Sequence, residues 1–124
     1  MQSCVVAVVD DDASVLRATQ VLLRSRAFTP LAYSSAEAFL QSSEGRQARC
    51  LILDVNLPGL SGVQLHEQLR REGMEIPAIL VTGGHTLDAL LGSQSPPAGV
   101  VAILEKPFDG DELLRWVALA LGHR

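Results

Sequence analysis

Six side chains whose types suit phosphate or metal chemistry stand at four separate places in this sequence of 124 residues. Three consecutive aspartates occupy positions 10–12, and a fourth, Asp54, lies far from them along the chain. Thr82 adds a hydroxyl group and Lys106 an ammonium group. Lys106 is also the single lysine among ten basic residues, since the other nine are arginines. The ammonium group of lysine is a compact point charge, whereas the guanidinium group of arginine is planar and donates in several directions. A single lysine therefore suggests a position that needs an ammonium group.

These residue types together indicate phosphoryl transfer. Asp10, Asp11 and Asp54 would repel one another in a partly dry cleft, and a hard divalent cation would relieve that repulsion. Mg²⁺ is typically held by few carboxylates, with water and phosphate oxygens completing its shell. A carboxylate can also attack phosphorus and form an aspartyl phosphate. Lys106 could pair with one phosphoryl oxygen and Thr82 could donate a hydrogen bond to another, which is the charge neutralisation that phosphoryl transfer requires.

Hydrophobic patterning predicts the strands that must position these residues. Four short runs rich in Val, Ile and Leu are each long enough for one strand, and their continuous apolarity is typical of strands covered on both faces. A weaker strand is expected around residues 28–33, where Pro30 cannot donate to a ladder and therefore indicates a sheet edge. The four strong strands are predicted at 4–9, 50–53, 78–81 and 100–104.

Helical patterns fill the intervals between the strands. The predicted helices are 13–24, a short one opened by a capping box of Ser34 and Glu37, 63–72, and a last one opened by Asp109 and Glu112. Residues 86–91 leave room for only a short fourth helix, because Pro96 and Pro97 end it early. The alternation predicts an α/β domain with a parallel sheet. Such sheets place their sites at the carboxyl ends of the strands, so the acids, Thr82 and Lys106 are expected in one crevice.

Composition excludes several classes of protein. With 48% hydrophobic and 19% charged residues, the chain is not disordered, and its length suits one domain with its own core. The longest apolar run, residues 4–9, is too short for a membrane span or a signal peptide. The net charge of −4 argues against direct binding to nucleic acid. Two cysteines without a secretory signal indicate free thiols in a reducing cytoplasm.

Four motifs resemble those of the receiver domain of bacterial two-component response regulators, along the full length of the chain. They are VVDDD (8–12), LILDVNLPGLSG (51–62), ILVTGG (79–84) and LEKPF (104–108), and YSSAEAFL (33–40) resembles the FixJ subfamily. A DD pair or a KP pair alone is a weak signal, but the ordered set, with each member at its strand end, is highly specific. The resemblance implies a flavodoxin-like (CheY-like), doubly wound sheet of five parallel strands in the order 2-1-3-4-5, with helices on both faces. The chain is expected to be a single receiver domain over residues 1–124, with no output domain in this chain. The stretch from Thr82 to Lys106 is a little longer than is usual in this family and contains Pro96 and Pro97, so a short or remodelled fourth helix is expected as a departure from the family pattern.

The resemblance also implies a metal site and a phosphorylation site. Asp54 matches the phosphoacceptor, while Asp10 and Asp11 match the acidic pair that holds Mg²⁺ together with Asp54 and the backbone carbonyl of Asn56. Mn²⁺ is an expected substitute for Mg²⁺, and no organic cofactor is implied. The implied reaction moves a phosphoryl group to Asp54 from a phosphohistidine on a histidine kinase or a histidine phosphotransfer protein. Self-catalysed hydrolysis then resets the domain, so no separate enzymatic activity is expected.

Residues around the implied phosphoryl group include one departure from the family. Lys106 matches the phosphate-pairing lysine, and its bond to Pro107 is expected to be cis. Thr82 matches the switch hydroxyl, followed by the small Gly83 that keeps the site open. At Ile103 many receivers carry an aromatic residue that changes rotamer with phosphorylation. Ile103 and the altered fourth helix together predict either an atypical output surface or a receiver that mainly relays or drains phosphoryl groups. A homodimer is compatible with the pattern.

Three alternative functions differ in the residues that they require. A flavodoxin-like module for nucleotides or flavins would need a cradle rich in Gly, Ser and Thr after the first strand, where three aspartates stand. A phosphatase of the haloacid-dehalogenase type usually has an acid two residues after the nucleophile, where Asn56 stands. A pseudo-receiver, which acts as a phosphorylation-independent interaction domain, is the stronger alternative. The complete set of site residues disfavours it, whereas Ile103 and the altered fourth helix leave it open.

Overall fold

The computed structural model of the chain describes residues 4–83 and 98–122, and within them the predicted strands and helices are present. The strands are β1 (Cys4–Val9), β2 (Phe28–Tyr33), β3 (Cys50–Asp54), β4 (Ala78–Thr82) and β5 (Val100–Glu105). The helices are α1 (Ala13–Ser25), α2 (Ala36–Leu40), α3 (Gly62–Arg71) and α5 (Gly110–Ala120), with a short 3-10 helix, η1 (Gly45–Gln47), before β3. The prediction of a short fourth helix, with Pro96 and Pro97 after it, lies outside the described residues.

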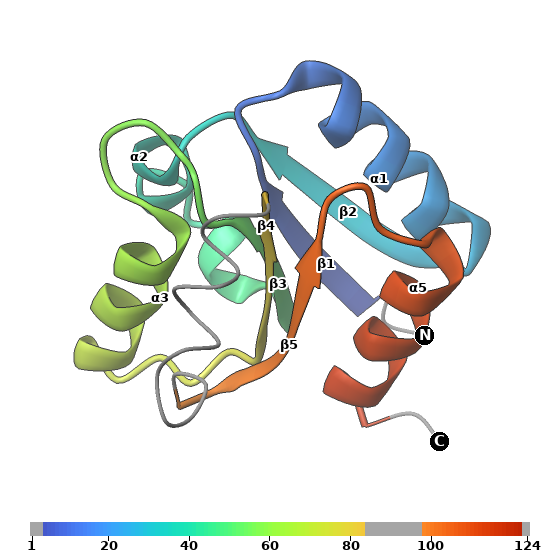
Figure 1. Cartoon of the computed structure of the whole chain (residues 1–124). Coiled ribbons are helices and arrows are strands. Elements are labelled where there is room, and N and C mark those ends of the chain that lie inside the picture. The colour runs from blue at the N-terminus through green and yellow to red at the C-terminus, as the bar shows by residue number, and fades with distance from the viewer. Residues whose placement is uncertain (1–3, 84–97, 123–124) are drawn as a thin grey trace.

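The five strands form one parallel sheet in the order β2-β1-β3-β4-β5, which confirms the predicted topology. Helices α1 and α5 lie on one face of the sheet, and α2 and α3 lie on the other (Figure 1). Each face has its own apolar core: Phe39, Leu65 and Leu69 pack on the α2–α3 side, while Leu23 and Val117 pack on the α1–α5 side. The sheet is therefore covered on both faces, as its apolar strands require.

Burial along the strands follows their place in the sheet. All five residues of β3 and all five of β4 are buried, because both strands have neighbours on each side and helices above and below. Strand β2 is an edge, as Pro30 predicts, and Pro30 stands opposite Val6 of β1 in the parallel register. A proline is tolerated there because its missing N–H faces no further strand.

Hydrogen bonds to side chains set where the helices begin. Asp12 caps α1 by accepting from the backbone N–H of Ser14 at 2.8 Å. The capping box predicted for Ser34 and Glu37 is wrong: Ser35 has the extended backbone of an N-cap, and its hydroxyl accepts from Ala38 N–H at 3.0 Å. The cap is thus one residue later, which moves Glu37 into the first turn of α2 and leaves its carboxylate available for a contact elsewhere.

The two cysteines, Cys4 and Cys50, are free thiols, as the sequence indicates. Burial raises the pKa of the Cys50 thiol to about 12, against the opposing hydrogen bond to the carbonyl of Leu51. The thiol therefore stays protonated at neutral pH and serves as a small apolar side chain in β3. None of the helices in the described ranges has the length and apolar character needed to span a bilayer.

His66 is a buried polar residue on the inner face of α3, with 2% of its surface exposed. Its Nε2 atom finds no hydrogen-bond partner among residues 4–83 and 98–122. The ring lies against Gly99, where an added Cβ would stand 3.0 Å from the His66 Cε1 atom, and Gly99 has a φ of +84°. Burial lowers the pKa of His66, although a hydrogen bond to the backbone of Ile76 opposes that shift. The buried imidazole is therefore favoured in its neutral form.

This burial predicts a loss of stability in mild acid. Below about pH 6.5 the unfolded chain protonates His66 while the folded chain resists it, so the free energy of unfolding should fall with decreasing pH. For one proton the slope is at most about 1.4 kcal/mol per pH unit, and above that pH the contribution is constant. Urea unfolding between pH 8 and pH 5 should show a steeper decline for the unsubstituted chain than for His66→Gln. Parallel curves for the two proteins would contradict the prediction.

Candidate functional site

The predicted site residues meet at the carboxyl edge of the sheet. Asp10 follows β1, Asp54 is the last residue of β3, and Lys106 follows β5. Lys106 is 96 residues from Asp10 and 52 from Asp54 along the chain, yet its ammonium group reaches both carboxylates. The parallel order of the sheet brings these strand ends together, as expected for an open α/β sheet.

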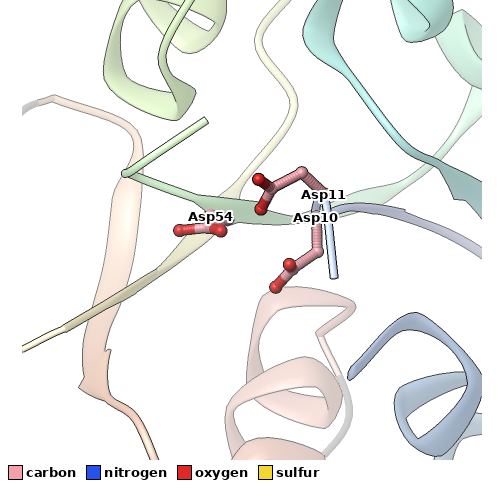
Figure 2. Close-up of side chains that lie close together, drawn as sticks. All are labelled: Asp10, Asp11 and Asp54. Atoms are coloured by element: carbon pink, nitrogen blue, oxygen red, sulfur yellow. The ribbon is translucent and has the colours of Figure 1, made fainter. Parts of the chain in front are cut away.

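Three carboxylates form one acidic cluster at this edge. Asp10, Asp11 and Asp54 each offer an oxygen, and these oxygens all lie within 4.8 Å of one another. Figure 2 shows the three carboxylates gathered around one space, with Asp54 approaching from a different segment than Asp10 and Asp11. Asp10 and Asp54 are buried, whereas Asp11 is exposed. Hard oxygen donors with one side open to water fit Mg²⁺, which keeps several waters in its shell.

Lys106 is the counter-charge of this cluster. Its Nζ atom lies 2.8 Å from Oδ2 of Asp10 and 3.4 Å from Oδ2 of Asp54. Partial burial lowers the pKa of Lys106, but the hydrogen bond and charge of Asp10, followed by those of Asp54, outweigh it and raise the pKa overall. The side chain is therefore a stable ammonium ion, held between the two carboxylates that it neutralises in part.

Asp54 has its two oxygens in different environments. The backbone N–H of Asn56 donates to Oδ1 at 2.9 Å, while Oδ2 faces the ammonium group of Lys106. Burial raises the pKa of Asp54, the Asn56 hydrogen bond lowers it, the charge of Asp10 raises it and Lys106 lowers it, with a net rise. The carboxylate is thus oriented by a donor on each oxygen, and its raised pKa means that its anionic form is destabilised, which favours bonding to a cation or to an electrophile.

The backbone of Thr82 contacts a site residue, Lys106, whereas its hydroxyl group bonds to Gly83. Its carbonyl accepts from the backbone N–H of Lys106 at 2.8 Å, which fixes where the chain leaves β5. The hydroxyl donates to the carbonyl of Gly83 at 3.1 Å, and no described contact joins it to Asp54. A Cβ added at Gly83 would meet the side-chain amide of Asn56 at 3.8 Å, an ordinary contact distance. Gly83 therefore borders the segment that follows Asp54.

The remaining predicted positions, Ile103 and Pro107, are described as well. Ile103 is half-buried on β5 and packs against the core on the α2–α3 side. The peptide bond between Lys106 and Pro107 is cis, as expected. Both residues thus flank the strand end that delivers Lys106 to the acidic cluster.

Two residues beside the site are not identified by sequence reasoning. Gly62 is the first residue of α3, and its backbone lies so close to that of Asp54 that a Cβ added at Gly62 would stand 2.4 Å from the Asp54 carbonyl oxygen. Glu37 of α2 accepts a hydrogen bond from the backbone N–H of Leu60, in the loop that joins Asp54 to α3. The LSG sequence at 60–62 is typical of a helix start, but no local pattern indicates which distant backbone that start must contact.

Residues 6–118 match the protein family described as response regulator receiver domain. The chain is 36% identical over 120 residues to the response regulator protein TodT of Pseudomonas putida, and the aligned region covers 97% of this chain and 52% of that protein. It is 40% identical over 116 residues to nodulation protein W of Bradyrhizobium diazoefficiens, covering 94% of this chain and 50% of that protein. The chain spans about half the length of these curated relatives.

Solved structures resemble the chain along its whole length. The crystal structure of FixJ-N matches with a TM-score of 0.82 at 30% identity, covering 100% of this chain and 98% of that one. The BeF3-activated DrrB receiver domain matches with a TM-score of 0.83 at 27% identity, covering 98% of this chain and 100% of that one. The likeness therefore includes the strand ends at which the acidic cluster stands.

Proposed function

We propose that this chain, which belongs to the response regulator receiver domain family, accepts a phosphoryl group on Asp54 and acts as a phosphorylation-dependent signalling switch. The observation that carries the proposal is the contact of Lys106 with both Asp10 and Asp54, beside the carboxylate of Asp11. A receiver domain belongs to two-component signalling, so the donor is a phosphohistidine on a histidine kinase or a histidine phosphotransfer protein. The reaction takes place in the cytoplasm, where free thiols such as Cys50 stay reduced.

The proposed reaction has two steps. In the first, a carboxylate oxygen of Asp54 attacks phosphorus, the new O–P bond replaces the P–N bond of the phosphohistidine, and the imidazole leaves with the electron pair. In the second, water attacks phosphorus and the bond to Asp54 breaks, which returns the carboxylate and releases inorganic phosphate. The N–H of Asn56 donates to Oδ1 of Asp54 at 2.9 Å, which gives the nucleophile a defined orientation before the attack.

Charge neutralisation falls to the residues around Asp54. The side chains of Asp10, Asp11 and Asp54, with the backbone carbonyl of Asn56, would hold Mg²⁺, for which Mn²⁺ can substitute. When bound, Mg²⁺ offsets the negative charge of the carboxylates and of the phosphoryl oxygens. Lys106 pairs with a phosphoryl oxygen as its contact with Asp54 loosens, because a dianionic phosphoryl group attracts the ammonium ion more strongly than one carboxylate does.

Thr82 is proposed as the residue that senses the phosphoryl group. In this proposal its hydroxyl exchanges the hydrogen bond to the Gly83 carbonyl for one to a phosphoryl oxygen. Ile103, which packs into the core on the α2–α3 side, carries no aromatic ring to follow that change. The change is therefore transmitted by a surface other than the one that a rotating aromatic residue at 103 would provide.

An apolar pocket next to Lys106 supports docking of a donor protein. The pocket has a volume of about 420 Å³ and lies between α1 and the segment that leads from β5 to α5. Its lining includes Val15, Ala18, Leu22 and Phe108. A partner that buries apolar side chains here would present its phosphohistidine within reach of the acidic cluster, since Lys106 forms part of both.

The test is a measurement of intact mass after incubation with acetyl phosphate, with Mg²⁺ and with the metal chelated. We expect a Mg²⁺-dependent gain of one phosphoryl group that hydroxylamine removes, and no gain in Asp54→Asn. Because the raised pKa of Asp54 means that its charge opposes folding at neutral pH, Asp54→Asn should remain folded at pH 7.

Asp12→Asn is the matched control for this experiment. It removes one neighbouring aspartate of the same run, and asparagine still caps α1, so phosphorylation should persist. Absence of a phosphoryl group on the unsubstituted chain, with acetyl phosphate and with a competent kinase, would refute the proposed function. A gain of equal size in Asp54→Asn would place the phosphoryl group on another residue.

A further inference from the structure

The loop between β3 and α3, residues 55–61, carries part of the proposed metal site. Asn56 stands in this loop, and its N–H holds Oδ1 of Asp54 while its carbonyl is a proposed ligand of Mg²⁺. The two ends of the loop are fixed: the N–H of Val55 donates to the carbonyl of Val81 at 2.9 Å, and Gly62 lies against the backbone of Asp54. Its middle is exposed at Pro58 and Gly59, so the position of that part depends on contacts from outside the loop.

Glu37 provides such a contact. Its Oε2 atom accepts from the backbone N–H of Leu60 at 3.2 Å. An added Cβ at Gly59, which has a φ of +75°, would stand 3.1 Å from the same oxygen, so the backbone of Gly59 passes directly along the carboxylate. Glu37 is free for this role because Ser35 caps α2. The carboxylate therefore joins α2 to the exposed part of the loop.

We infer that Glu37 is a positioning residue for the metal site, acting through the loop of residues 55–61. The inference rests on the proposed function, because there the carbonyl of Asn56 binds Mg²⁺. A restrained loop presents that carbonyl without first losing conformational freedom, whereas a loosened loop must be ordered when the metal binds. Glu37 itself touches neither the metal ligands Asp10 and Asp54 nor the reacting atoms in the described structure.

The test compares Mg²⁺ affinities by isothermal titration calorimetry. Glu37→Ala should weaken Mg²⁺ binding about fivefold, the change expected from losing one hydrogen bond of about 1 kcal/mol. Glu37→Gln keeps an oxygen that can accept from Leu60 N–H, so its affinity should return to within about twofold of the unsubstituted chain. At saturating Mg²⁺ all these proteins should be phosphorylated by acetyl phosphate at similar rates, because the defect concerns metal binding alone.

Glu44→Ala is the matched control, because it removes the same charge from an exposed residue whose side chain makes no cap hydrogen bond in the described structure. Unchanged Mg²⁺ affinity in Glu37→Ala, or equal weakening in Glu44→Ala, would overturn the inference. Failure of Glu37→Gln to restore affinity would also overturn it. A chain that binds Mg²⁺ but gains no phosphoryl group would refute the proposed function, while the comparison of affinities would still decide the role of Glu37. Absence of Mg²⁺ binding in the unsubstituted chain would overturn the inference at once.

Discussion

Lys106→Ala is expected to slow phosphorylation of Asp54 by acetyl phosphate about a hundredfold or more at saturating Mg²⁺, the loss typical of removing one preorganised electrostatic partner. The ammonium group lies 2.8 Å from Asp10 and 3.4 Å from Asp54. In the proposed reaction it would therefore stand beside the phosphoryl oxygens, where negative charge gathers in the transition state. Alanine leaves that charge without its partner. The rate of mass gain over time, with Mg²⁺ held at saturation, measures the effect.

Lys106→Arg is the control that keeps the charge. A planar guanidinium replaces a compact ammonium in a partly buried position, so the rate should recover only in part. In Lys106→Ala, moreover, Asp10 and Asp54 lose their counter-charge, and the pKa of the Asp54 carboxyl should rise further above its usual range. A rate for Lys106→Ala within a few-fold of the unsubstituted chain would contradict the role of the lysine.

Gly62→Ala is expected to lower the free energy of unfolding by about 3 kcal/mol, at the upper end of overpacking effects. The added Cβ would stand 2.4 Å from the carbonyl oxygen of Asp54 and 3.2 Å from the Cβ of Leu53. Both belong to β3, which is buried throughout and flanked by β1 and β4, so the strand cannot move aside without disturbing the sheet. Urea unfolding monitored by the fluorescence of Trp116, which packs on the α1–α5 side, measures the loss.

Gly73→Ala is the control that shows how much stability a Gly→Ala change costs through backbone conformation alone, without a steric clash. Gly73 has a φ of +85°, and no described heavy atom lies within 4 Å of a Cβ added there, so alanine meets a conformational cost alone, of about 1 kcal/mol. Gly62→Ala should be clearly less stable than Gly73→Ala. Equal stabilities of the two variants would mean that α3 can shift away from Asp54 at little cost in free energy. The close approach at Gly62 would then contribute nothing to the loss of stability.

Four of the five strands could be predicted directly from the sequence, because each is a continuous apolar run between segments with a helical pattern; β2 is the weaker exception, interrupted by Thr29 and Pro30. The predicted strands at 50–53, 78–81 and 100–104 are each one residue short, since Asp54, Thr82 and Glu105 continue the pairing with polar side chains. Apolarity reports burial of a strand, whereas the last pair of a strand is set by backbone hydrogen bonds, which any residue type can make.

The start of α2 could not be predicted by the same reasoning. Ser34 and Ser35 stand side by side, and each precedes residues that suit a first turn. A capping box from Ser34 would occupy the carboxylate of Glu37 locally, but that carboxylate instead accepts from Leu60, 23 residues away. The choice between the two serines therefore depends on a tertiary contact that short-range patterns do not contain.

The charged residues of the candidate site could be predicted because their residue types indicate one chemistry and the strand order places them at one edge of the sheet. Asp10, Asp54 and Lys106 each follow or end an apolar run, and parallel strands bring their carboxyl ends together. The direction of the Thr82 hydroxyl and the burial of His66 were not predictable. A rotamer is chosen by immediate neighbours, and a histidine on a helix gives no sign in the sequence of which segment will cover it.

The acidic cluster and its lysine have a consequence for fragments of this chain. A break at the Gly73 turn would leave Asp10 and Asp54 in the first fragment and Lys106 in the second, so each fragment would carry an incomplete set of charges. The fragments would regain the site only by pairing β3 with β4 across the break, in the register that sets Leu53 opposite Leu80. If two co-expressed halves formed an acyl phosphate on Asp54, they would have reassembled into one sheet. Phosphorylation of Asp54 could therefore be used to measure whether two fragments of this chain associate.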